Sequence, residues 1–148
     1  MKATRTWILV ADGGKARILE NLGPGHGIHQ VPNMDETLIL PPNRDLLSDR
    51  PGRGFESASP TRHAYETADP HRDMKRQFAH HLLLKLKEFH GRGAFDRLVI
   101  VAPPAMLGDL RAAIGPELSK VVVGELAQDL VHLPTGEIEK HIGKLIAV

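Results

Sequence analysis

Residues 7–19 read WILVADGGKARIL, and this stretch decides how the fold begins. Residues 7–11 and 16–19 are two apolar runs with the length of short β-strands. Between them, Asp12-Gly-Gly-Lys15 places a glycine pair where a two-residue hairpin turn needs positive φ values. The same glycines beside a lysine could cradle a phosphate, but the GxxxxGK[ST] and GxGxxG spacings are both absent. The stretch therefore predicts an N-terminal β-hairpin closed by a plain turn.

A long helix is the strongest pattern further along the chain, from about residue 71 to residue 90. Asp69-Pro70 supplies a capping residue and then a proline for the first turn. Apolar residues recur at helical spacing and mark the buried face: Met74, Phe78, Leu82, Leu86 and Phe89. Gly91 and Gly93 are predicted to end this helix.

Strand and helix patterns alternate around the long helix. A third strand is predicted in residues 28–31, in residues 37–40, or in both, and the pattern does not choose between them. After the helix, the pattern predicts a buried strand at 97–102 and a second helix, which Pro103-Pro104 introduces and Gly115-Pro116 stops. A strand at 120–123 and a helical turn within 125–131 follow. Thr135 is predicted to cap a last helix, whose inward-facing residues are Ile138, Ile142, Leu145 and Ile146.

This order predicts one α/β domain over residues 1–148, with a mixed β-sheet and helices packed on its faces. A chain of 148 residues with 41% apolar residues suits a single domain with a single core. The residues predicted to be largely buried are Trp7, Leu9, Ile18, Phe78, Leu82, Val99, Val101, Leu110, Val122, Ile138 and Ile142.

Composition excludes several classes of protein. The formal net charge is +1, so no strong field points to DNA, RNA or an anionic membrane. The chain has no cysteine, which excludes disulfides, thiolate catalysis and cysteine-ligated zinc, and fits a reducing compartment. The apolar run at residues 7–11 is too short for a signal-peptide core or a membrane span. We therefore expect a cytoplasmic protein with no membrane partner.

Residues 41–70 form a long segment with no regular apolar pattern. A loop of this length inside a compact domain is usually functional or disordered, so we expect the functional residues here. Its arginines suit bidentate contacts with phosphates or carboxylates, and Gly52 and Gly54 would let the backbone beside Arg53 approach a partner closely.

Acidic residues of the same loop offset the charge of its arginines. Internal arginine–carboxylate pairs are therefore the preferred interpretation. They would hold residues 48–55 on the domain and leave residues 57–61 mobile.

Histidines and serines give no catalytic pattern. His80 and His81 are adjacent on the long helix, so their side chains point about 100° apart and cannot share a metal ion. Two alternatives stay open: a metal site at His63 with Glu66 and Asp69, and a hydrolase that uses His63 with Glu66 or Asp69. No GxSxG elbow is present. We therefore predict no catalytic residue, no metal site and no cofactor, and the sequence favours a protein that is not an enzyme over an enzyme.

Several motifs together resemble the bacterial host attachment protein family, whose members are described as required for attachment to host cells. They are Trp7-Ile-Leu-Val-Ala-Asp12, Ser48-Asp-Arg-Pro-Gly-Arg53 with Phe55, Arg62-His-Ala64, Phe78-Ala79, the run from Phe95 to Pro104, Leu107-Gly108 and Asp129-Leu130. The resemblance runs over nearly the whole chain, and the segment from Ser48 to Ala64 is its most specific part.

That family is in turn similar to the middle domain of archaeal and eukaryotic class I release factors. The resemblance implies an RNase H-like fold, with a long loop between the early strands and a long helix. In those release factors the loop carries Gly-Gly-Gln, which promotes peptidyl-tRNA hydrolysis. This chain has Gly52-Arg53-Gly54 in the corresponding region and no Gly-Gly-Gln, so the catalytic residues are not carried over.

The leading hypothesis is a non-enzymatic, ribosome- or RNA-associated accessory factor that affects attachment indirectly. Basic residues of the loop and of the helix start would contact phosphates: Arg50, Arg53, Arg62, Arg72, Lys75 and Arg76. The alternative is a protein-interaction or signalling module for host or surface attachment without nucleic acid, which the near-zero net charge supports. In this alternative, partner contacts or internal clamps of the loop would come from Asp49, Arg50, Arg53 and Glu66. The residues of the loop motif as a whole are Asp49, Gly52, Gly54, His63 and Glu66.

Overall fold

A mixed β-sheet lies at the centre of the computed structural model, which describes residues 3–38 and 70–148. Within these ranges the strands are β1 (Thr6–Ala11), β2 (Lys15–Asn21), β3 (His29–Gln30), β4 (Glu36–Thr37), β5 (Arg97–Val101) and β6 (Val122–Leu126). The strand order is β3-β2-β1-β5-β6, and β4 also pairs with β2. The β1–β2 pair is antiparallel, whereas β1–β5 and β5–β6 are parallel. The prediction of a single α/β domain with a mixed sheet is confirmed for the described residues.

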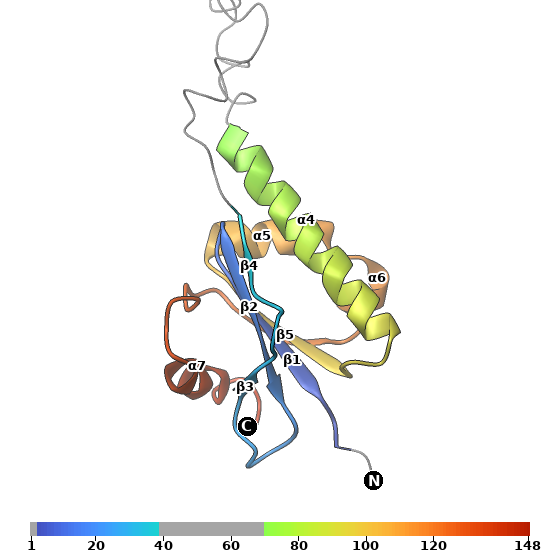
Figure 1. Cartoon of the computed structure of the whole chain (residues 1–148), viewed down its shortest axis with the longest axis vertical. Helices are drawn as coiled ribbons and strands as arrows, with labels where there is room; N and C mark the ends of the chain where they lie inside the picture. Colours follow the sequence, from blue (N-terminus) through green and yellow to red (C-terminus); the bar gives the residue numbers. More distant parts are fainter. Residues whose placement is uncertain (1–2, 39–69) are drawn as a thin grey trace, which may run out of the picture.

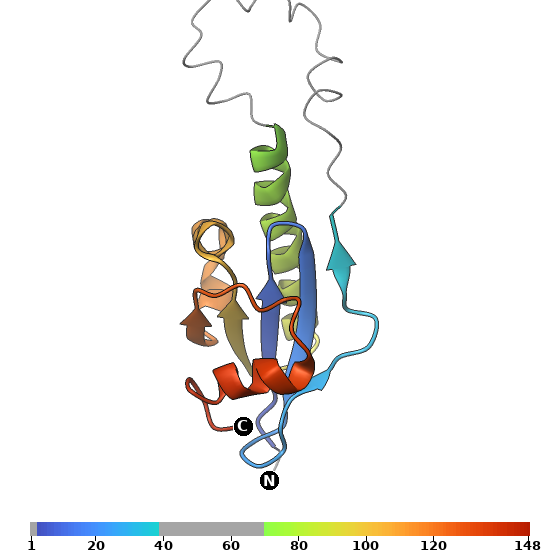
Figure 2. The ribbon, with the colours of Figure 1, turned by 90° about the vertical axis from the view of Figure 1, so that its left-hand side faces the viewer.

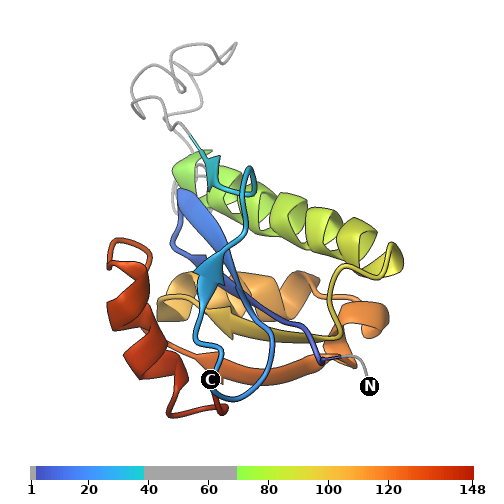
Figure 3. The ribbon, with the colours of Figure 1, turned by 60° about the horizontal axis from the view of Figure 1, so that its bottom comes forward.

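The helices pack on both faces of this sheet (Figure 1). They are α4 (Pro70–Gly91), α5 (Pro104–Ala113), α6 (Pro116–Ser119) and α7 (Thr135–Ile142). Figure 3 shows α7 separated from α4 by the sheet. The described chain therefore forms three layers, with α4, α5 and α6 on one face and α7 on the other.

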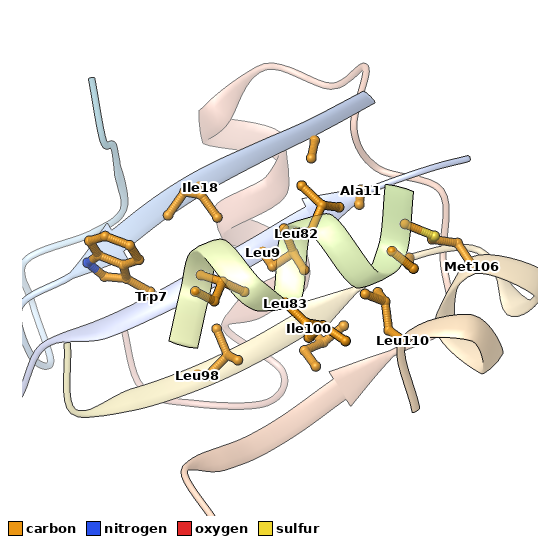
Figure 4. Close-up of a cluster of buried hydrophobic side chains, with 14 of the residues drawn as sticks. Trp7, Leu9, Ala11, Ile18, Leu82, Leu83, Leu98, Ile100, Met106 and Leu110 are labelled. Atoms are coloured by element: carbon orange, nitrogen blue, oxygen red, sulfur yellow. The ribbon is translucent and has the colours of Figure 1, made fainter. Parts of the chain in front are cut away.

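Side chains of β1 alternate between the two cores, as the period of a strand requires. Trp7, Leu9 and Ala11 are buried against α4 and α5 (Figure 4), whereas Ile8 and Val10 are buried with residues of α7. Such a strand, covered on both faces, reads as a continuous apolar run in the sequence.

The indole of Trp7 satisfies its polar atom within this core. It stacks on Phe95 with 4.9 Å between ring centroids, while its Nε1 donates a hydrogen bond of 2.9 Å to Glu20 Oε2. A buried tryptophan is therefore held by packing on one side and by a carboxylate on the other.

The N-terminal hairpin forms as predicted, with Ala11 opposite Ala16, but its turn differs from the prediction. Among the described residues, positive φ values at glycine occur at positions 23, 25, 27 and 93, not at Gly13 or Gly14. The Asp12 side chain closes the turn instead, because its Oδ1 accepts hydrogen bonds of 2.8 and 2.7 Å from the amides of Gly14 and Lys15. An aspartate in this role removes the need for left-handed backbone.

The long helix and the short strands after the hairpin agree with their predictions. The helix spans Pro70–Gly91, with its proline in the first turn and Gly93 at a φ of 78° just beyond its end. Of the two candidate positions for a third strand, both are occupied, each by two residues. The capping role predicted for Asp69 lies outside the described residues.

Three predictions in the C-terminal third are wrong. Pairing with β5 extends β6 to Leu126, so a strand replaces the start of the predicted helical turn. Val122 is only half-buried, because β6 is an edge strand. Leu145 is exposed, because α7 ends at Ile142. The other residues predicted for the core are buried.

Two helix-end details also differ from the predictions. Gly115-Pro116 ends one helix as predicted, but Pro116 also begins the short α6. Pro134, rather than Thr135, occupies the N-cap of α7, and it makes no side-chain capping bond. The hydroxyl of Thr135 instead accepts a hydrogen bond from Arg17.

None of the helices within residues 3–38 and 70–148 combines the length and the apolar character needed to traverse a lipid bilayer.

Candidate functional site

The carboxyl ends of β1, β5 and β6 meet at one edge of the sheet, because the three strands are parallel. The chain leaves β1 toward β2 on one side and leaves β5, through α5, toward β6 on the other. Ligands of open α/β sheets bind at such a switch point, outside the carboxyl ends of the strands. We call this region the carboxyl edge. It comprises the hairpin turn at residues 12–15, the first turns of α4, the start of α5 and the loop at residues 127–134. Figure 2 shows the hairpin turn beside α4.

Lys75 of α4 reaches the hairpin turn through its aliphatic chain. A Cβ atom added at Gly13 would lie 3.0 Å from Lys75 Cδ, so only glycine leaves room for this lysine without displacing it. Among the described residues, no acidic side chain lies within ion-pair distance of the Lys75 ammonium group. The aliphatic chain of Lys75 is therefore packed against the hairpin turn, while its ammonium group is available to bind an anion.

Two pockets share Gly13 and Lys75. The first has a volume of about 370 Å³ and is lined by Asp12, Gly13, Gly14, Lys15, Thr37, Leu38 and Lys75. The second has a volume of about 330 Å³ and is lined by Gly13, Arg72, Lys75, Pro103, Ala105, Met106 and Asp109. Lys75 consequently stands between two hollows of the carboxyl edge.

Arg72 joins α4 to α5 at this edge. Its guanidinium donates two hydrogen bonds to Asp109, of 2.8 Å to Oδ2 and 2.6 Å to Oδ1. The Asp109 side chain is 9% exposed, and that of Arg72 is 33% exposed. Arg72, predicted as a phosphate contact, is thus engaged in a largely buried bidentate pair.

Arg76, the third predicted contact on this helix, pairs with Asp73 one turn earlier, at 2.9 Å. Both side chains are more than half exposed, and an exposed pair of this kind contributes little to stability. Its guanidinium can therefore exchange this partner for another anion at small cost.

The other residues singled out from the sequence, Asp49, Arg50, Gly52, Arg53, Gly54, Arg62, His63 and Glu66, lie outside the described residues. The same is true of the predicted clamp at residues 48–55 and of the mobile stretch at residues 57–61. The adjacent histidines of the long helix are both exposed, and His81 contacts Glu36 of β4 at 3.1 Å.

Glu36 fastens β4 to the long helix. Hydrogen bonding from the Lys85 ammonium is the main cause that lowers the pKa of Glu36. Burial opposes this shift, and a hydrogen bond with His81 lowers the pKa further. This two-residue strand, which pairs with β2, is therefore also fastened to α4 by a side-chain ion pair.

The loop at residues 127–134 is fastened to β2 by Arg17. The guanidinium donates to the carbonyl oxygens of Val131 and Leu133, at 3.1 and 2.6 Å, and to the hydroxyl of Thr135, at 3.1 Å. His132, between the two carbonyls, comes within 3.4 Å of Asp12. No local pattern predicts this contact, because Asp12 and His132 lie near opposite ends of the chain.

The structure also resembles a solved structure described as an archaeal protein, with a TM-score of 0.53 and 12% sequence identity. The similarity covers 97% of this chain but 34% of the other, so this chain spans about a third of that protein. At this identity the likeness concerns the fold alone. A search of curated proteins gave no match. The relation to release factors, with the RNase H-like fold that it implies, stays a prediction.

The family comparison is more direct. A family model described as "Protein required for attachment to host cells" matches residues 7–142, which include every strand and helix of the described fold except the first residue of β1, Thr6. The resemblance seen in the sequence motifs is thereby confirmed. The chain belongs to the family of proteins required for attachment to host cells.

Proposed function

We propose that this protein is a non-enzymatic, ribosome- or RNA-associated accessory factor, which holds RNA phosphates at its carboxyl edge and affects attachment indirectly. The observation that carries the proposal is Lys75, whose ammonium group has no acidic partner among the described residues and stands between two pockets. A lysine held by its stem with its charge free is suited to contact a phosphate.

The surroundings of Lys75 favour an anion. Lys75 lies in the second turn of a 22-residue helix, close to the end where the helix dipole is positive. The two carboxylates nearest to the pockets are already bound: Asp109 by Arg72, and Asp12 Oδ1 by two backbone amides. Arg76 and Lys15 add exposed positive charge on either side.

Sedimentation of tagged protein from its own cells tests this proposal. We expect the protein in ribosomal or RNA-containing fractions at low salt, and its release as salt rises, because phosphate contacts release counterions. A variant with Lys75 and Arg76 changed to glutamate should remain at the top of the gradient. If the wild-type protein is absent from every such fraction at low salt, the proposal is wrong.

A second candidate function, a protein-interaction module, is supported by a different part of the surface. Leu84 is 54% exposed on the outer side of α4 and borders a pocket of about 280 Å³ that α4 forms with α6. The same pocket is lined by further apolar residues, among them Leu83, Ala113, Pro116 and Leu118. It therefore suits an apolar side chain of a partner. Recovery of a defined protein by affinity purification, lost in Leu84→Ser and kept in Lys75→Ala, would favour this candidate over the first.

A further inference from the structure

We propose that Asp12, Asp129 and His132 form a binding site for a divalent transition-metal ion. Each side chain offers one ligand atom, and the three atoms lie within 4.8 Å of one another. Two of the donors are carboxylate oxygens and one is an imidazole nitrogen. A metal site formed by these three residues is a separate property from the proposed RNA binding, which requires no metal.

The backbone around each end of the site is fixed. Asp12 uses Oδ1 to close the hairpin turn, which leaves Oδ2 directed at His132 Nε2, 3.4 Å away. Arg17 binds the carbonyl groups on both sides of His132, and Leu130 and Val131 are buried in the core beneath α7. The donors are therefore brought together by the fold, and a metal ion would not have to order this loop.

Electrostatics favour a cation at this position. Two carboxylates within 4.8 Å repel each other, and a divalent cation between them converts the repulsion into attraction. All three donors follow strands whose carboxyl ends meet at the switch point: Asp12 follows β1, and Asp129 and His132 follow β6. Asp12 lines the 370 Å³ pocket, and His132 lines another of about 380 Å³, so the site is open to solvent on two sides.

The donor set indicates the class of metal. Mg²⁺ and Ca²⁺ prefer oxygen ligands alone, whereas an imidazole together with carboxylates suits Zn²⁺, Mn²⁺ or Fe²⁺. Three protein ligands would leave further coordination positions for water or for a phosphate oxygen. We therefore expect Zn²⁺ or Mn²⁺ to bind and Mg²⁺ to bind much more weakly.

Isothermal titration of the full chain with Zn²⁺ tests the site. Nine histidines make weak adventitious binding a concern, so His80→Ala, which removes an exposed histidine on α4, is the matched control. We expect one Zn²⁺ per chain for the wild type and for His80→Ala. Asp129→Asn and His132→Ala should each lower the affinity by about tenfold to a hundredfold or more.

Both test residues are exposed, so the two variants should fold normally, which thermal unfolding without metal would verify. Zn²⁺ should raise the melting temperature of the wild type and of His80→Ala but not of Asp129→Asn or His132→Ala. The proposal is overturned if the wild type does not bind Zn²⁺. It is equally overturned if His80→Ala weakens binding as much as His132→Ala does.

Discussion

The aliphatic chain of Lys75 packs against the backbone of Gly13, so that a Cβ atom at position 13 would lie 3.0 Å from Lys75 Cδ. The contact links the first turns of the long helix to the turn that ends β1. Lys75 also lines both pockets of the carboxyl edge. A side chain at position 13 would therefore displace the lysine that borders the two pockets.

Gly13→Ala should alter binding while leaving stability nearly unchanged. The lysine stem can move by a few tenths of an ångström, and alanine restricts the unfolded chain, so we expect the free energy of unfolding to change by less than about 0.5 kcal/mol. RNA affinity should fall, because Lys75 is displaced. Urea denaturation and fluorescence anisotropy measure the two quantities.

Gly108→Ala is the matched control for this substitution. Gly108 lies in α5, and a Cβ atom added there would meet nothing within 4 Å outside its own helix, so alanine should stabilise the fold by about 0.5–1 kcal/mol. Its RNA affinity should equal that of the wild type. An unchanged RNA affinity in Gly13→Ala would show that the contact does not position Lys75.

Arg72→Ala should destabilise the fold by about 2 kcal/mol, because it leaves the largely buried Asp109 carboxylate without its partner. This value is below that of a fully buried pair because Arg72 is partly exposed. Arg76→Ala, which breaks an exposed pair on the same helix, should cost less than about 0.5 kcal/mol. A double-mutant cycle with Asp109→Ala isolates the pair. Equal losses for the two arginine variants would contradict the assignment.

Acid should weaken the attachment of β4 through Glu36. Since the folded-state pKa of Glu36 lies below its unfolded value of 4.5, its contribution is present above that value. It is lost as the pH falls from about 5 through the lowered pKa. Unfolding free energies of the wild type and of Glu36→Gln should therefore converge as the pH falls from 7 to 3. A gap that stays constant over this range would contradict the ion pair with Lys85 as its source.

Arg17→Ala should loosen the loop at residues 127–134. The side chain donates hydrogen bonds to two carbonyl groups of that loop, and alanine leaves both without their donor. We expect faster amide hydrogen exchange at residues 130–135, with little change in α4. Arg111→Ala, which removes an exposed partner of Glu125, is the control. Equal protection of the loop in both variants would show that Arg17 is not its anchor.

The sequence predicted the parts of the fold that rest on continuous local patterns. Two apolar runs around a short turn indicated the hairpin, and helical spacing with an N-terminal proline indicated α4. Predictions from local sequence patterns were wrong where contacts between different segments determine the local structure. The register with β5 carries β6 to Leu126, and hydrogen bonds that the Asp12 carboxylate accepts from backbone amides replace the expected left-handed glycines.

The candidate site was predictable only in part. Lys75 and Arg76 were identified from charge near a helix start, but charge alone could not show that Arg72 is bound by Asp109 of another helix. The approach of Asp12 to Asp129 and His132 joins distant parts of the chain. Only Asp12 directly follows a predicted strand, whereas Asp129 lies in the predicted helical turn at 125–131 and His132 just after it. The three residues come to one edge because β1, β5 and β6 are parallel, which the sequence pattern did not show.

Whether Lys75 holds an RNA phosphate is decided by the equilibrium binding of a fluorescently labelled ribosomal RNA hairpin, measured over a series of salt concentrations. Lys75→Ala and Lys87→Ala each remove one positive charge from α4, at positions about 18 Å apart along the helix. We expect weaker binding for Lys75→Ala, with a slope of log affinity against log salt reduced by about 1, and wild-type behaviour for Lys87→Ala. Equal effects of the two substitutions, or no binding by the wild type at low salt, would contradict this expectation.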